Sequence, residues 1–154
     1  MIIIRSKRFL EAGIPEIDGI NETATDKNMS DPELRASLIN WLKKTWQGKS
    51  VFNKALKDKI DIPRRGIDKL EGMLAFREQI LATKRIDKIL SESIIDDWNF
   101  DQKGRKSVDS YVYLTCKCKI NSKMFKITSY IRKTINSPLK FYGFILIDIK
   151  IEAI

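Results

Sequence analysis

Two strongly alternating segments joined by only two residues constrain the fold of this chain more than any other feature. Residues 111–120 and 123–132 each alternate between apolar and polar side chains, and Asn121 and Ser122 lie between them. Period-two alternation is typical of strands with one buried face, and a two-residue connection is typical of a tight hairpin. The sequence therefore predicts an antiparallel pair of strands.

The tight turn also sets the register, because Ile120 then lies opposite Lys123 and the pairing continues residue by residue. One face of the hairpin consists of apolar partners: Val112 with Ile131, Cys116 with Ile127, and Cys118 with Phe125. The other face consists of polar and aromatic partners: Tyr111 with Arg132, Tyr113 with Tyr130, Thr115 with Thr128, and Lys117 with Lys126. We expect the first face to be buried and the second to be exposed.

The second face, called the basic face below, has a pattern suited to a polyanion. Opposed ammonium groups repel, so Lys117 and Lys126 destabilise the ladder unless an anion such as a phosphate neutralises them. Hydroxyls donate to phosphate oxygens, tyrosine rings stack on bases, and the guanidinium of Arg132 suits bidentate phosphate contact. The alternative is a solvated sheet face, in which Thr and Tyr occur because they favour β-strands and Lys prevents aggregation.

A helix is predicted well before this hairpin. Ser30 and Glu33 form a capping box, Pro32 lies in the first turn, and Gly48 ends the pattern, which indicates a helix over about 31–47. The residues that fall at helical spacing on one face are Leu34, Leu38, Trp41, Leu42 and Thr45, and Trp41 is expected in the core. This helix supplies apolar surface that the sheet can cover.

The remaining segments complete an α+β pattern. Residues 50–53 and 58–62 are short extended segments, and the apolar spacing of residues 66–91 predicts two helices. Residues 141–151 are a third strand of the C-terminal sheet, with Tyr142 on the side of the basic face. We therefore expect N-terminal helices packed on one face of a C-terminal antiparallel meander.

The division of the chain follows from the same patterns. Residues 1–30 are expected to be a short strand at Ile2–Ile4 followed by an irregular arm, and residues 31–154 a single domain. No apolar run is long enough for a signal peptide or a membrane span, so we expect a cytoplasmic protein without a membrane partner.

Composition excludes several kinds of chemistry. The chain has no histidine, which excludes imidazole acid/base catalysis and His-liganded zinc, and we expect neither a metal nor another cofactor. Cys116 and Cys118 point to the same apolar face of one strand, so we interpret them as buried, reduced thiols.

Positive charge is concentrated in the last third of the chain. Residues 1–102 hold 18 Lys/Arg against 17 Asp/Glu, and residues 103–154 hold 11 against 3, within a net charge of +9. A field of one sign attracts polyanions, so nucleic acid is the expected partner, ahead of an acidic protein. The peripheral phosphate contacts that we expect are Arg64, Arg65, Arg105 and Lys106, with solvated loops as the alternative.

The order of several segments carries a family resemblance. The segments are Trp41 through Val51-Phe52-Asn53, Gly66-Ile67-Asp68-Lys69-Leu70, Gly104-Arg105-Lys106 through Tyr113, the hairpin around Asn121, and Phe141-Tyr142. Together they resemble the nuclease-like domains of phages and mobile elements that are grouped with the barnase, EndoU, colicin and RelE ribonucleases, including the large polyvalent protein-associated domains. The resemblance implies a RelE/barnase-like sheet with RNA on its open face.

The resemblance also implies a histidine after the Gly66–Leu70 segment and another on the last strand. This chain has Glu71-Gly72-Met73 and Tyr142-Gly143-Phe144 at those places. Some RelE-like and colicin-like enzymes use Lys, Arg and Tyr instead, and cations can stabilise the transition state of RNA cleavage. The expected catalytic residues are Lys126 and Arg132 as phosphate and transition-state contacts, Tyr130 or Tyr113 as acid/base, and Lys117 as electrostatic helper.

Three functions remain open from the sequence. The first is a metal-independent endoribonuclease of the toxin type, whose nucleic-acid contacts include Thr115, Thr128, Tyr111 and Tyr142. The second is an inactive relative that only binds nucleic acid. The third is an interaction protein whose basic face meets an acidic inhibitor or immunity protein.

Overall fold

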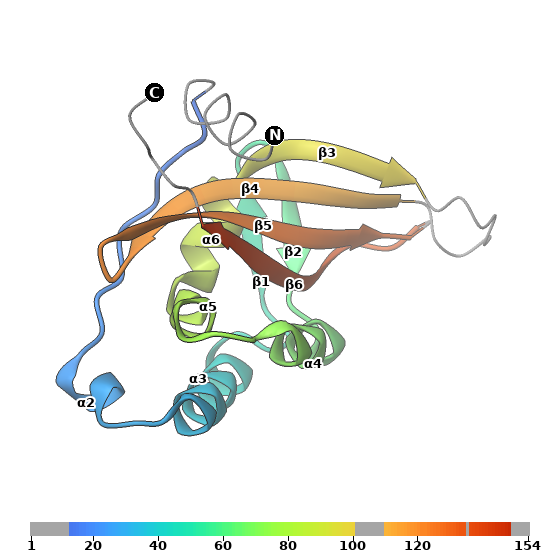
Figure 1. Cartoon of the computed structure of the whole chain (residues 1–154). Helices are drawn as coiled ribbons and strands as arrows, with labels where there is room; N and C mark the ends of the chain where they lie inside the picture. Colours follow the sequence, from blue (N-terminus) through green and yellow to red (C-terminus); the bar gives the residue numbers. More distant parts are fainter. Residues whose placement is uncertain (1–12, 101–109, 135, 149–154) are drawn as a thin grey trace.

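Helices lie on one face of a six-stranded sheet in a computed structural model that describes residues 13–100, 110–134 and 136–148, with backbone only for residues 97–100 (Figure 1). The helical elements are α2 (Ala24–Lys27), α3 (Asp31–Thr45), α4 (Arg64–Met73), α5 (Arg77–Ala82), the 3-10 turn η1 (Thr83–Arg85) and α6 (Ile86–Glu92). The strands are β1 (Ser50–Asn53), β2 (Asp58–Asp61), β3 (Ile94–Phe100), β4 (Ser110–Ile120), β5 (Lys123–Lys133) and β6 (Leu139–Asp148). The expected α+β class is confirmed.

The sheet has the order β1-β2-β6-β5-β4-β3. All neighbouring strands are antiparallel except β2 and β6, which run parallel through Ile60–Leu139 and Asp61–Lys140. The hairpin of β4 and β5 has the predicted register along its whole length, from Ser110–Lys133 to Ile120–Lys123. The sheet is therefore mixed rather than a purely antiparallel meander, because the short N-terminal strands extend its edge.

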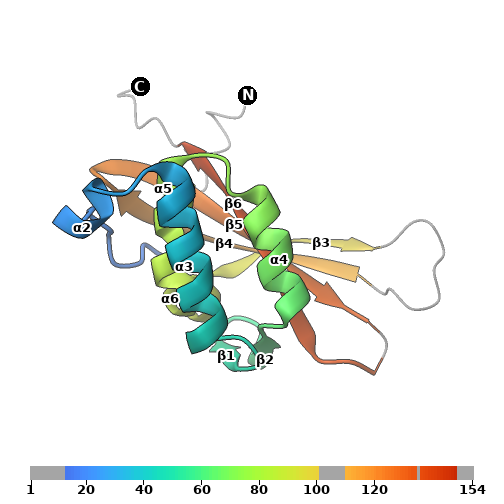
Figure 2. The ribbon, with the colours of Figure 1, turned by 90° about the horizontal axis from the view of Figure 1, so that it is seen from below.

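The core lies between the sheet and the helices: α4, α5 and α6 contact the sheet, and α3 packs against α4 and α5 on the side away from it (Figure 1 and Figure 2). The capping box of α3 forms as predicted between Ser30 and Glu33, and Leu34, Leu38 and Leu42 are buried. Trp41 was expected to be buried as well, but 36% of its surface is exposed. The large side chains that are fully buried include Phe141, Phe144, Ile60, Ile67, Ile80 and Ile86.

The predicted buried thiols are confirmed. Cys116 and Cys118 are both buried and not joined by a disulfide. Burial raises the pKa of the Cys116 thiol to about 12 and that of Cys118 to about 11. Both thiols therefore stay protonated and serve as small apolar groups in the core.

Several elements differ from the sequence-based expectation. β3 is absent from the prediction, and the region expected to hold two helices contains α4, α5, η1 and α6. The helix α4 ends at Met73 because Leu74 adopts an extended backbone conformation. The expected strand at Ile2–Ile4 lies outside the described residues, as do Arg105 and Lys106.

Residues 15–22, part of the segment expected to be irregular, lie along the outer edge of β4, and α2 follows them. The Ile17 amide donates to the Lys117 carbonyl at 2.9 Å, and the Ile20 amide donates to the Lys119 carbonyl at 2.8 Å. Ile17 and Ile20 are both part of the core. This segment, called the arm, thus continues the edge that β3 occupies at Ser110–Thr115.

α4 lies very close to β6. A Cβ atom on Gly66 would lie 1.9 Å from the Phe141 carbonyl oxygen, so only glycine fits there. On the strand side, a Cβ on Gly143 would lie 2.6 Å from the Met73 sulfur, and Gly143 has a φ of +107°. Gly66 lets the first turn of α4 lie directly against β6, and Gly143 does the same for its last turn.

Candidate functional site

A β-bulge in β6 positions the central side chain of the site. Ile131 pairs with Phe141 and Ser129 pairs with Phe144, so Tyr130 faces two residues, Tyr142 and Gly143. The positive φ of Gly143 permits the extra residue in the strand. A bulge redirects the side chains beside it, and here it leaves Tyr142 in contact with β5 and α4.

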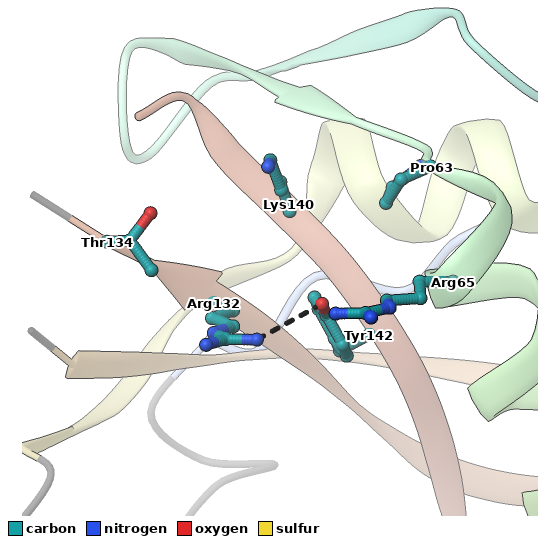
Figure 3. Close-up of a pocket in the computed structure, with 6 residues that line it drawn as sticks. All are labelled: Pro63, Arg65, Arg132, Thr134, Lys140 and Tyr142. Atoms are coloured by element: carbon teal, nitrogen blue, oxygen red, sulfur yellow. Dashed lines mark hydrogen bonds between the residues drawn. The ribbon is translucent and has the colours of Figure 1, made fainter. Parts of the chain in front are cut away.

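Three of the predicted site residues meet at this bulge. The Nη1 atom of Arg132 donates to the Tyr142 hydroxyl at 3.2 Å, and the guanidinium carbon lies 5.5 Å from the Tyr142 ring centroid. Arg65 reaches the same hydroxyl from the first turn of α4. Figure 3 shows the two guanidinium groups on either side of the phenol oxygen. We call Arg65, Arg132 and Tyr142 the Arg–Tyr–Arg cluster.

A pocket of about 320 Å³ opens over the cluster (Figure 3). Its lining consists of Pro63, Arg65, Arg132, Thr134, Lys140 and Tyr142. Three of these side chains are cationic and none is acidic. The first turn of α4 also begins here with no side-chain cap at Pro63, so its amide dipoles add positive potential. The pocket is suited to an anion the size of a phosphate.

The arginines change the acidity of the phenol. Burial by itself raises the pKa of Tyr142, but the hydrogen bond and charge of Arg132, followed by those of Arg65, outweigh it, and the pKa lies below the ordinary tyrosine value. Positive neighbours favour the phenolate over the neutral phenol. A larger fraction of Tyr142 is thus in the phenolate form near neutral pH than for an ordinary tyrosine.

The opposite end of the basic face is not exposed as expected. Lys126 has only 8% of its surface exposed, and Thr115 and Thr128 are buried as well. The prediction considered two strands alone, whereas β3 and β6 flank them and bring Ile94 opposite Thr115 and Ile145 opposite Thr128. Short central side chains between such neighbours lose their access to solvent.

An acidic side chain of the protein itself offsets the repulsion expected between Lys117 and Lys126. The two lysines are direct partners in the register, and the Nζ atom of Lys126 lies 3.2 Å from Oδ2 of Asp96 in β3. The carboxylate of Asp96 supplies the negative charge that the sequence pattern led us to expect from a bound phosphate. A buried ion pair of this kind is primarily structural.

A stability difference between the two lysines follows. Lys126→Ala removes a buried partner from Asp96, and we expect the free energy of unfolding to fall by about 2 kcal/mol. Lys117→Ala is the matched control, because that side chain is half-buried and its removal relieves repulsion; its change should stay within about 0.5 kcal/mol. Urea unfolding measures both variants. Equal losses would contradict the role given to Asp96.

The two tyrosines in the middle of the face pack against each other. The rings of Tyr113 and Tyr130 meet edge to face with centroids 5.3 Å apart. Burial, with a smaller effect of Tyr113, raises the pKa of Tyr130 above its ordinary value. Tyr130 therefore stays a neutral phenol and is unsuited to act as a base.

The residues expected to act together span a long stretch of β5. Lys126 and Arg132 are six residues apart, which corresponds to about 20 Å along a strand. Lys117 lies with Lys126 at the far end, whereas Tyr111 lies directly opposite Arg132. A single phosphate contacts only one end, and the pocket lies at the Arg132 end. Arg64 is exposed on α4 and lines neither that pocket nor the cluster.

Sequence reasoning missed Lys140, Thr134 and Asp96. Lys140 lies directly opposite Arg132, so the pattern of β6 could have identified it had the register been known. The long connection between β5 and β6 left that register open. The sequence pattern could not identify Asp96, because it does not predict the strand β3 on which Asp96 lies.

Comparison with known proteins gives one family. The model of the family described as "Large polyvalent protein-associated domain 3" matches residues 29–142, which covers most of the chain and every residue of the Arg–Tyr–Arg cluster. No curated protein and no solved structure matches the chain. Among the described residues, no helix has the length and apolar character needed to cross a membrane.

Proposed function

This chain belongs to the large polyvalent protein-associated domain 3 family, and from that premise we propose that its Arg–Tyr–Arg cluster binds and cleaves the backbone of RNA without a metal. The observation that carries the proposal is the Tyr142 phenol held between two arginines in a cationic pocket. We also infer that the domain is of the toxin type, and the family match is consistent with an origin from a phage or mobile element.

The geometry supports a division of roles within the cluster. Arg132 and Arg65 contact the non-bridging oxygens of the phosphate and stabilise the negative charge that grows in the transition state. The Tyr142 phenolate accepts the proton of the 2′-hydroxyl, whose oxygen then forms a bond to phosphorus. The bond from phosphorus to the 5′-oxygen breaks, and that oxygen takes a proton from water. The products are a 2′,3′-cyclic phosphate and a free 5′-hydroxyl.

The absence of histidine favours a second candidate, a relative that binds nucleic acid or an acidic partner without cleaving it. The same pocket serves this function, because the arginines bind phosphate whether or not Tyr142 removes a proton. Cleavage is what separates the two candidates.

The test combines cleavage with binding. Purified protein is incubated with total RNA in EDTA, and we expect fragments that end in a 2′,3′-cyclic phosphate. If the RNA stays intact although the protein binds it, the result would favour the second candidate, a relative that binds without cleaving. Neither cleavage nor binding would remove RNA as the partner.

The binding arm has its own expected result. With two or three phosphates neutralised, affinity for a single-stranded RNA should fall about tenfold between roughly 50 and 200 mM salt, because each contact releases counterions. Fluorescence anisotropy with a labelled oligonucleotide measures the slope. An affinity that does not depend on salt would contradict a phosphate-binding pocket.

A further inference from the structure

Two pockets, not one, open onto the Arg–Tyr–Arg cluster. Both share Arg65, Arg132 and Tyr142 in their lining. The first extends to Thr134 and Lys140, and the second, of about 510 Å³, extends along α4 to Asp68 and Lys69. The cluster is thus the centre of a longer trough, and a polymer crossing it meets further protein surface on each side.

The two extensions differ in charge. The Lys140 extension has no acidic side chain in its lining, and within the described residues Lys140 makes no ion pair. Asp61 of β2 is the partner of Lys140 across the sheet, but its carboxylate accepts a hydrogen bond from the Ser50 hydroxyl at 2.6 Å and does not line the pocket. In the α4 extension, Asp68 offsets Lys69, and its carboxylate lies 3.6 Å from Lys43 of α3. A second anion is therefore favoured on the Lys140 side and not on the α4 side.

The position of Lys140 relative to the cluster is fixed by the sheet. Lys140 and Arg132 are direct partners across β6 and β5, and adjacent strands lie about 4.8 Å apart. Lys140 is half-buried, so its stem has little freedom, and Thr134 adds a hydroxyl donor in the same pocket. Figure 3 shows Lys140 on β6 and Thr134 at the end of β5, near Arg132. The spacing suits neighbouring phosphates of one strand.

Resting on the proposed function, we propose that Lys140 and Thr134 form a subsite for a second backbone phosphate, next to the one that is cleaved. The substrate is then a chain that carries at least two consecutive phosphates, and the protein acts on internal linkages in preference to a lone phosphodiester.

The experiment compares three short substrates: a dinucleoside monophosphate, the same molecule with an added 3′-phosphate, and the same molecule with an added 5′-phosphate. We expect the unmodified protein to have a kcat/KM about tenfold higher for one of the two longer substrates. Lys140→Ala should abolish that advantage, whereas Lys133→Ala should keep it. Lys133 is the matched control, because it is an exposed lysine of β5 outside the pocket.

The outcomes separate this inference from the proposed function. Affinities for the 2′-deoxy forms of the same three molecules test the subsite even if no RNA is cleaved. A binding advantage that disappears in Lys140→Ala supports the subsite. Equal behaviour of all three molecules with the unmodified protein, or an equal loss in Lys140→Ala on all three, overturns it.

Discussion

A Gly66→Ala variant is expected to lose about 3 kcal/mol or more in the free energy of unfolding, a large effect for one methyl group. The added carbon would lie 1.9 Å from the Phe141 carbonyl oxygen. That oxygen belongs to the backbone of β6, which is held by β5, so it cannot move aside at low cost. Either α4 shifts away from the sheet or the strand distorts, and both separate Arg65 from Tyr142.

Gly72→Ala provides the control in the same helix. A Cβ atom at Gly72 meets no other atom within 4 Å, so no clash is expected. Ala has a higher helix propensity than Gly, and the variant should gain about 0.5–1 kcal/mol. Urea unfolding compares the two. A loss in both variants would show that α4 tolerates neither change, and no loss in Gly66→Ala would contradict the tight contact with β6.

The second large effect concerns catalysis. Tyr142→Phe removes the proton acceptor but keeps the ring, and we expect the cleavage rate to fall by roughly a hundredfold or more. Arg132→Ala should cost a similar factor, because it removes a transition-state contact. RNA affinity should fall far less in Tyr142→Phe, since the phenol contributes little to ground-state binding. Gel-resolved cleavage and anisotropy measure the two quantities, and equal losses in both would contradict a catalytic role.

The pH profile gives a signature that a merely structural role of Tyr142 would not produce. A base works in its deprotonated form, so the rate should rise with pH and level off at the pKa of Tyr142, which the arginines hold below the ordinary value. Arg65→Ala removes one of those charges, so its profile should level off at higher pH. A rate that falls with rising pH would instead make the phenol an acid.

Much of the fold could be predicted because its strongest signals are local. The two-residue turn after Ile120 determined every pair between β4 and β5, and the capping box at Ser30 determined the start of α3. Tyr142 was expected beside the basic face, and it does contact Arg132. These features need only neighbouring residues and the alternation of one face.

The rest depends on contacts between distant parts of the chain. Asp96 neutralises Lys126 from a strand whose pairing with β4 includes a register shift, and alternation alone does not predict such a shift. The sequence analysis places Arg65 among the peripheral phosphate contacts, because no sequence pattern near Gly66 predicts that α4 packs on β6. The three residues of the cluster could therefore be named from the sequence, whereas Lys140, Thr134 and the assembly of the site at the Arg132 end could not.

The arm described above has a consequence for how the domain behaves as a separate piece. β4 has one outer edge, which β3 covers at Ser110–Thr115 and the arm covers at Lys117–Ile120. An uncovered strand edge is a template on which a second molecule adds strands and aggregates. The segment that matches the family begins at residue 29, after the arm. A fragment cut at that boundary would keep the Arg–Tyr–Arg cluster yet expose the edge of β4 from Lys117 to Ile120, and we expect it to be less soluble than the longer chain.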